Sequence, residues 1–139
     1  MAVGKERLGI IGVGAMGSAL LTGILREGLF APEQVMINDL DGNRLAQVAE
    51  KARVRAAASN IDVVESADVI LLAVKPNVMG LVLEEIGGRL GARQLLLSIA
   101  AGIDLTFIES RLSADVPVIR AMPNTPCLVG KGAIALSPG

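Results

Sequence analysis

The chain has 139 residues, of which 52% are hydrophobic and 19% are charged, and its formal net charge is −1. This length suits a single domain with a substantial core, and the charge balance argues against nucleic-acid binding. Because histidine and tyrosine are absent, a histidine base, a histidine metal ligand and a tyrosine acid are all excluded, and we expect no metal site. The single cysteine, Cys127, excludes an internal disulfide, fits a reducing compartment and lacks a histidine that would activate it.

Short apolar runs alternate with helix-length segments along the chain. Asn60 is a plausible N-cap, Pro76 opens a helix at a favoured position, and Asp104 caps a helix that runs to Leu112. This alternation predicts an α/β fold, a doubly wound parallel sheet of the Rossmann-like kind in the order 3-2-1-4-5-6, with a last edge strand. The predicted strands are 7–11, 34–38, 54–56, 68–74, 94–98, 116–121 and 132–136, and the other predicted helices are 15–27, 42–51, 60–66 and 76–86.

The first strand runs directly into a glycine turn with the spacing G-x-G-x-x-G. Gly12 allows the tight turn, Gly14 lets the backbone approach a pyrophosphate, and Gly17 lets the following helix pack on the strand. The free N–H groups and the positive end of that helix then face the phosphates. The cofactor-binding candidates here are Ile11, Gly12, Val13, Gly14, Ala15, Met16 and Gly17.

Residues 8–25 carry no charge and follow Lys5 and Arg7, so a membrane span or a signal peptide is the alternative interpretation. Five glycines interrupt the segment in the pattern that a phosphate turn requires. We therefore expect no membrane association and take the cytoplasm as the location.

An acidic residue follows the second predicted strand at the distance that a dinucleotide fold uses. Asp39 lies 22 residues after Gly17, where a carboxylate bonds the hydroxyls of the adenosine ribose and repels a 2′-phosphate, which favours NAD. Asn38 can bond either ribose, and Arg44 can swing towards a 2′-phosphate. The alternative is that Asp39 is a turn residue in the segment NDLDG.

The loops after strands four and five should line the same edge of the sheet. Val74 offers an apolar face to a nicotinamide ring, and Lys75 is either a phosphate contact or acid, or a solvated lysine at a strand end. Small residues after strand five leave room for a flat ring or a substrate. The candidates are Ala73, Val74, Lys75, Pro76, Ile99, Ala100, Ala101 and Gly102.

The loop after strand six, residues 120–126, reads RAMPNTP. Two prolines stiffen it, Asn124 and Thr125 offer short polar groups, and Arg120 offers a cation. From the residues alone, it is either a rigid substrate-side loop or a structural cross-link between strand ends.

Four segments of the chain resemble pyrroline-5-carboxylate reductases: residues 12–16, 73–76, 100–102 and 120–126, the last continuing as CLVGKG. The match runs from Leu8 to about Leu136 and covers the amino-terminal half of such an enzyme. The resemblance implies hydride transfer from NAD(P)H to the C=N carbon of 1-pyrroline-5-carboxylate, which gives L-proline, the last step of proline biosynthesis. This chemistry fits the absence of histidine, since an imine protonated in solution is already electrophilic and mainly needs orientation.

The same resemblance implies roles for single residues. It implies that the glycine turn holds the pyrophosphate, that Asn60 contacts the cofactor, and that 73–76 and 99–101 line the nicotinamide. The residues expected on the substrate side are Gly102, Met122, Pro123, Asn124 and Thr125.

Two departures from the family pattern change the expectations. Asp39-Leu40 stands where the family often has a small polar residue followed by arginine, which suits NADPH, so Asp39 slightly favours NADH here. The family's carboxyl-terminal helical domain, which forms the dimer and binds the substrate carboxylate, is absent. We therefore expect one dinucleotide-binding domain, residues 1–139, that binds cofactor but turns over poorly alone.

Two alternatives stay open on the sequence. One is the cofactor domain of a related hydroxy-acid dehydrogenase, which shares the glycine turn but uses a lysine of its second domain. The other is a nucleotide-sensing module without a reaction. The loop at 120–126 separates the first alternative from the reductase interpretation, and the second rests on the end of the sequence at Gly139.

Overall fold

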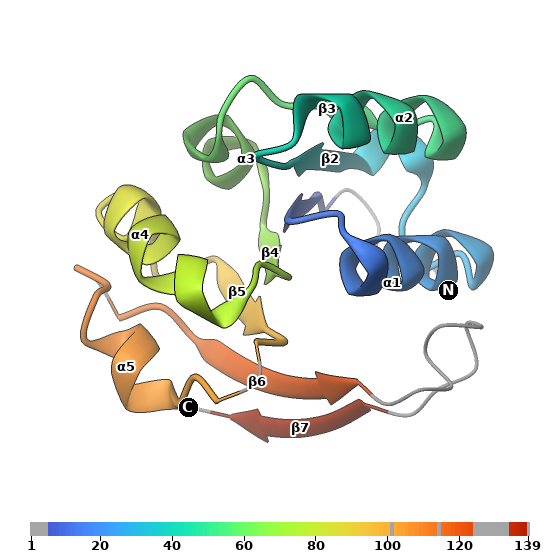
Figure 1. The fold of residues 1–139 in the computed structure, drawn as a ribbon. Coiled ribbons are helices and arrows are strands. Elements are labelled where there is room, and N and C mark those ends of the chain that lie inside the picture. Colours follow the sequence, from blue (N-terminus) through green and yellow to red (C-terminus); the bar gives the residue numbers. More distant parts are fainter. Residues whose placement is uncertain (1–5, 101, 114, 124–133, 139) are drawn as a thin grey trace.

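A computed structural model describes residues 6–100, 102–113, 115–123 and 134–138. These residues form a seven-stranded sheet in the order β3-β2-β1-β4-β5-β6-β7. The neighbours from β3 to β6 pair in parallel, and β7 pairs antiparallel to β6 (Figure 1). The predicted α/β class and the order 3-2-1-4-5-6 are thereby confirmed.

The strands are β1 (Leu8–Ile11), β2 (Val35–Asn38), β3 (Arg55–Ala56), β4 (Val69–Leu72), β5 (Leu95–Ser98), β6 (Val118–Pro123) and β7 (Ile134–Pro138). The helices are α1 (Ala15–Arg26), α2 (Gly42–Ala52), α3 (Asn60–Ser66), α4 (Pro76–Ile86) and α5 (Leu105–Glu109), with a 3₁₀ turn at Pro32–Gln34.

Helices cover both faces of the sheet, which explains the unbroken apolar runs of the inner strands. On one face, Leu20 and Leu21 of α1 pack with Ile10 and Ile37 of the strands. The other face carries α3, α4 and α5, whose buried side chains Val63, Met79, Leu83 and Ile108 pack with Ile11, Ile70 and Leu96. Neighbouring residues of one strand, such as Ile10 and Ile11, therefore pack on opposite faces of the sheet.

Three local expectations are corrected by the structure. Ser59, not Asn60, caps α3, since its hydroxyl accepts from the Asp62 N–H at 3.2 Å. Asp104 caps α5 as predicted, but this helix ends at Glu109 because the chain turns away to let Ser113 donate to the Gly87 carbonyl at 3.0 Å. The last strand is antiparallel, so the sheet is parallel only from β3 to β6.

Candidate dinucleotide-binding site

The glycine turn joins β1 to α1 and packs against the residue that follows β4. Gly12 has φ +98, and a Cβ there would lie 2.7 Å from the Ala73 carbonyl oxygen. A Cβ at Gly17 would overlap the Gly12 carbonyl oxygen. By contrast, a Cβ at Gly14, the N-cap of α1, would have as its nearest neighbour the Arg44 guanidinium carbon at 4.0 Å. The turn therefore needs glycine for its own packing at Gly12 and Gly17, and it stays open at Gly14.

Two cavities flank this turn at the carboxyl edge of the strands. The first, which we call the Asp39 cavity, has a volume of about 320 Å³ and is lined by Ile11, Gly12, Gly14, Ala15, Asp39, Leu40, Arg44, Asn60, Ala73, Val74, Lys75, Val78 and Val82. The second, which we call the Ile99 cavity, has a volume of about 460 Å³ and is lined by Gly14, Ala15, Met16, Ala73, Val74, Lys75, Pro76, Ile99, Ala100, Gly102, Arg120 and Ala121. Five residues, 14, 15 and 73–75, line both, so the two cavities meet over the glycine turn.

The Asp39 carboxylate connects the glycine turn to the start of α2. Its Oδ2 accepts from the Val13 N–H at 2.8 Å, and its Oδ1 accepts from the Asp41 N–H at 2.8 Å and from Arg44 Nη2 at 3.0 Å. The Asp39 side chain is 5% exposed, whereas that of Arg44 is 48% exposed. Asp39 is therefore held by two backbone groups, and the half-exposed Arg44 is its one side-chain partner among the described residues.

These contacts determine the charge state of Asp39. Burial by itself raises the pKa of the carboxyl, but the N–H groups of Asp41 and Val13 and the Arg44 guanidinium outweigh it, so the pKa lies below its ordinary value. The carboxylate is thus stabilised in its charged form at the mouth of the Asp39 cavity.

A second polar group in this cavity comes from α3. Asn60 is 8% exposed, its Oδ1 accepts from Asn38 Nδ2 at 2.6 Å, and its Nδ2 donates to Glu85 Oε1 of α4 at 2.8 Å. Three elements, β2, α3 and α4, therefore share one chain of side-chain hydrogen bonds.

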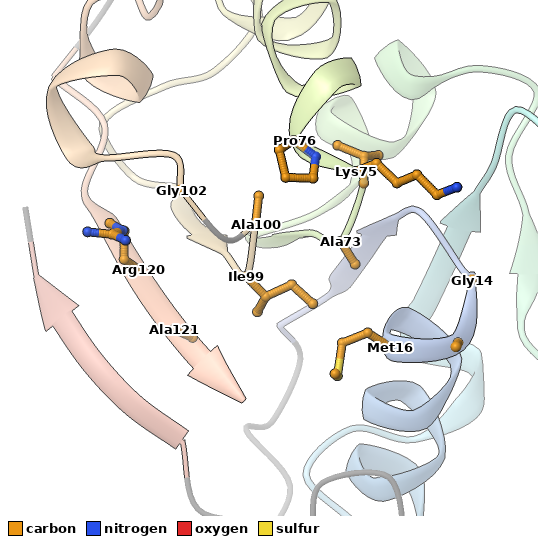
Figure 2. Close-up of a pocket in the computed structure, with 12 residues that line it drawn as sticks. Gly14, Met16, Ala73, Lys75, Pro76, Ile99, Ala100, Gly102, Arg120 and Ala121 are labelled. Atoms are coloured by element: carbon orange, nitrogen blue, oxygen red, sulfur yellow. The ribbon is translucent and has the colours of Figure 1, made fainter. Parts of the chain in front are cut away.

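The Ile99 cavity is mostly apolar. Figure 2 shows Met16 and Ile99 facing one another across it, with Ala73 beside the turn and Arg120 at the far side. In Figure 2 the Lys75 side chain extends away from Ile99. Lys75 also lines the Asp39 cavity, and no described residue accepts a hydrogen bond from it. The cavity therefore has mostly apolar walls, and Lys75 and Arg120 are the two cationic residues among those that line it.

The structure brings most of the predicted residues together. Val13, Gly17 and Asn38 line neither cavity: Val13 is buried in the core, Gly17 packs on Gly12, and Asn38 contacts Asn60. Met122 and Pro123 belong to β6, while Ala101, Asn124 and Thr125 lie outside the described residues. The sequence did not single out four residues that line the cavities, Leu40, Val78, Val82 and Ala121, nor Glu85, which contacts Asn60. The helical spacing of positions 78, 82 and 85 is a signal that could have found those three.

An open glycine turn and an acidic residue after β2, at the edge of a sheet ordered 3-2-1-4-5-6, define a Rossmann-type dinucleotide-binding domain. Comparison with known proteins gives the particular family. The chain belongs to the family described as NADP oxidoreductase, coenzyme F420-dependent, whose sequence model matches residues 7–102.

Individual relatives agree on a narrower similarity. Pyrroline-5-carboxylate reductase of Escherichia coli (strain K12) is 38% identical over 134 residues, which cover 96% of this chain and 50% of the relative. The Synechocystis enzyme of the same name is 39% identical over 132 residues, covering 94% and 48%. The resemblance identified from the loops is thereby confirmed, and the chain spans about half the length of the curated relatives it matches.

Solved structures show the same similarity. The Coxiella burnetii pyrroline-5-carboxylate reductase superposes with a TM-score of 0.86 at 29% identity and covers 97% of this chain and 50% of its own. The Plasmodium falciparum pyrroline carboxylate reductase, a structure with NADP bound, gives 0.81 at 29% identity, covering 96% and 48%. Within the described part of this chain, no helix has the length and apolar character needed to span a bilayer.

Proposed function

We propose that this chain is the dinucleotide-binding half of a pyrroline-5-carboxylate reductase and that it presents NADH or NADPH to 1-pyrroline-5-carboxylate. The observation that carries the proposal is the similarity over 96% of the chain to an enzyme of that name, together with the two cavities that meet at the glycine turn. The hydroxy-acid dehydrogenase and the nucleotide-sensing module lose support, because the relatives that match nearly the whole chain are named pyrroline-5-carboxylate reductase.

The two cavities suit the two ends of a dinucleotide. The Asp39 cavity supplies a carboxylate and the Asn60 amide for the adenosine ribose, and the open backbone at Gly14 and the start of α1 suit the pyrophosphate. Val74 and Ile99 offer apolar surface for the nicotinamide ring in the Ile99 cavity. The bound cofactor supplies a hydride, and the residues of this chain hold and orient the cofactor.

Among the described residues of this half, none suits proton transfer to the substrate. Lys75 and Arg120 are the ionisable groups among the described residues that line the Ile99 cavity. Arginine does not give up its proton, and the Lys75 side chain points away from Ile99, so neither is suited to protonate a substrate beside the nicotinamide ring. A substrate imine that is protonated in solution needs mainly orientation beside the ring. We assign the substrate side of the cavity to Gly102, Met122, Pro123, Asn124 and Thr125, with the substrate carboxylate bound outside this chain.

The relative use of NADH and NADPH follows from how many acceptor sites Asp39 has left. A carboxylate offers about four lone-pair sites, and Val13, Asp41 and Arg44 occupy three of them. An unphosphorylated ribose brings two hydroxyl donors, so Arg44 must withdraw when NADH binds. A 2′-phosphate would instead meet the Arg44 guanidinium and be opposed by Asp39. The site thus accepts either cofactor, with Asp39 favouring NADH and Arg44 favouring NADPH.

The full enzyme would be a cytoplasmic homo-oligomer, assembled through the domain that its relatives have beyond this half. The support is the half-length match and the single cysteine of this chain.

A chimera tests the proposal. Residues 1–139 are joined to the remaining half of the E. coli enzyme, and oxidation of NADPH and NADH is followed with 1-pyrroline-5-carboxylate and, separately, with a 2-oxo acid. We expect oxidation with the pyrroline alone. A chimera that binds cofactor but oxidises it only with the 2-oxo acid, or with neither, contradicts the proposal. The Gly17→Ala chimera serves as the inactive control.

A further inference from the structure

We propose that Glu85 of α4 is a positioning residue for cofactor binding: it fixes the amide of Asn60 through a hydrogen bond and so presets the polar pattern of the Asp39 cavity. The inference rests on the proposed function, because it assumes that a dinucleotide occupies this cavity. It adds a residue that lines neither cavity and lies 25 positions from Asn60 in the sequence.

Along the chain of hydrogen bonds, Asn38 donates to Asn60 and Asn60 donates to Glu85. An ionised carboxylate only accepts hydrogen bonds, so Glu85 Oε1 requires the Nδ2 end of the Asn60 amide, at 2.8 Å. The Oδ1 end of Asn60 then faces β2, where it accepts from Asn38 Nδ2 at 2.6 Å. Glu85 therefore decides which end of the Asn60 amide points in which direction.

The orientation matters because Asn60 is buried and lines the Asp39 cavity. An amide has two donor and two acceptor sites, and the two contacts use one of each. One N–H and one lone pair of Asn60 remain for a group that both donates and accepts, such as a hydroxyl of the adenosine half. A preset amide saves the ordering cost that a freely turning amide would add when the ligand binds.

Glu85 can be changed without disturbing the core. Its side chain is exposed, as is that of the neighbouring Glu84, which makes no side-chain hydrogen bond to any described residue. Both lie within α4, so identical substitutions at the two positions alter the net charge and the helix alike. Glu84 is therefore the matched control.

The test is a calorimetric titration of the chain with NADPH and with NADH for four variants. Glu85→Gln keeps an acceptor oxygen and should bind within about twofold of the unchanged chain. Glu85→Ala loses the contact and should bind about fivefold more weakly, the ratio that one ordinary hydrogen bond gives. Glu85→Lys presents only donors and favours the reversed amide, so it should bind about tenfold more weakly, although its added positive charge attracts the cofactor.

Glu84→Lys carries the same charge change away from Asn60 and should bind as tightly as the unchanged chain, or more tightly. Thermal unfolding followed by circular dichroism checks that all four variants fold. Equal affinities of Glu85→Lys and Glu84→Lys would overturn the role of Glu85 and leave the proposed function intact. An unchanged chain that binds neither cofactor would overturn both.

Discussion

The two cavities that meet at the glycine turn are built on opposite principles. In the Asp39 cavity, Asp39 and Asn60 make hydrogen bonds to five other described residues before any ligand arrives. In the Ile99 cavity, apolar and small side chains form most of the walls, and Lys75 and Arg120 are the two cationic residues among those that line it. On the proposed function, preset polar groups would hold one end of the dinucleotide, while the apolar walls of the Ile99 cavity would contact the other end and leave room for a second reactant.

The largest effect should come from closing the turn between the cavities. In Gly17→Ala the new Cβ overlaps the Gly12 carbonyl oxygen, so the turn must open or α1 must move away. We expect the free energy of unfolding to fall by about 3 kcal/mol and cofactor binding to be lost. Gly42→Ala, whose Cβ would meet no atom within 4 Å, should leave both unchanged. Thermal unfolding and calorimetry measure the pair, and normal binding by Gly17→Ala would refute the role of the turn.

Asp39→Asn should lower both the stability of the fold and the affinity for the cofactor. Losing the charged acceptor of the Val13 and Asp41 N–H groups should cost about 1–3 kcal/mol at neutral pH. Because folding lowers the pKa of Asp39, its contribution is fully present above the ordinary value of about 3.8 and is lost as the pH falls through the lower folded value.

Thermal unfolding between pH 7 and pH 2 measures this effect. The unchanged chain should lose its advantage over Asp39→Asn only below about pH 4. Asp62→Asn, an exposed position in α3, is the control for the same substitution. A constant difference over the whole range would show that the charge of Asp39 is not what stabilises the turn.

Arg44→Ala should change the choice of cofactor rather than the fold. Removing the guanidinium frees a lone pair of Asp39 for the ribose of NADH and removes the cation that would meet a 2′-phosphate. We expect the ratio of NADPH to NADH affinity to fall about tenfold, and less at high salt. Lys51→Ala, which removes a cation from the far end of α2, should not move the ratio. A ratio that stays the same in Arg44→Ala would overturn this specificity argument.

The smallest effect concerns the one large exposed apolar side chain that lines the Asp39 cavity. Leu40 is 84% exposed and lines the cavity, whereas Leu81 is 71% exposed and lines neither. Leu40→Ala should weaken binding of either cofactor about threefold through lost apolar contact. Leu81→Ala should have no effect in the same titration. If both variants bind the cofactor with equal affinity, the adenosine end of the cofactor does not lie against Leu40.

Much of this comparison could be predicted from the sequence. The alternation of strands and helices predicted the order of the first six strands, and the glycine spacing predicted the turn, because local periodicity and steric demands carry that information. The direction of the last strand and the early end of α5 could not be predicted in this way. They depend on tertiary contacts, such as the one between Ser113 and Gly87.

The polar partners in the Asp39 cavity were harder to predict than its position. Asp39 was expected to meet a ribose, but its contact with the Val13 N–H depends on how the turn folds back over β2. Asn60 was expected to start a helix as its cap, yet its side chain joins Asn38 to Glu85. Sequence spacing identifies which residues reach the sheet edge, whereas the choice among several possible partners there is made by packing.

The most direct test of the contrast between the cavities is calorimetric titration of the chain with two overlapping fragments of the dinucleotide: ADP-ribose, which lacks only the nicotinamide, and nicotinamide mononucleotide, which lacks the adenosine end. We predict saturable binding of ADP-ribose within about tenfold of NADH. Nicotinamide mononucleotide should bind at least about a hundredfold more weakly, because the polar contacts lie on the adenosine side. Nicotinamide mononucleotide binding as tightly as ADP-ribose would contradict it.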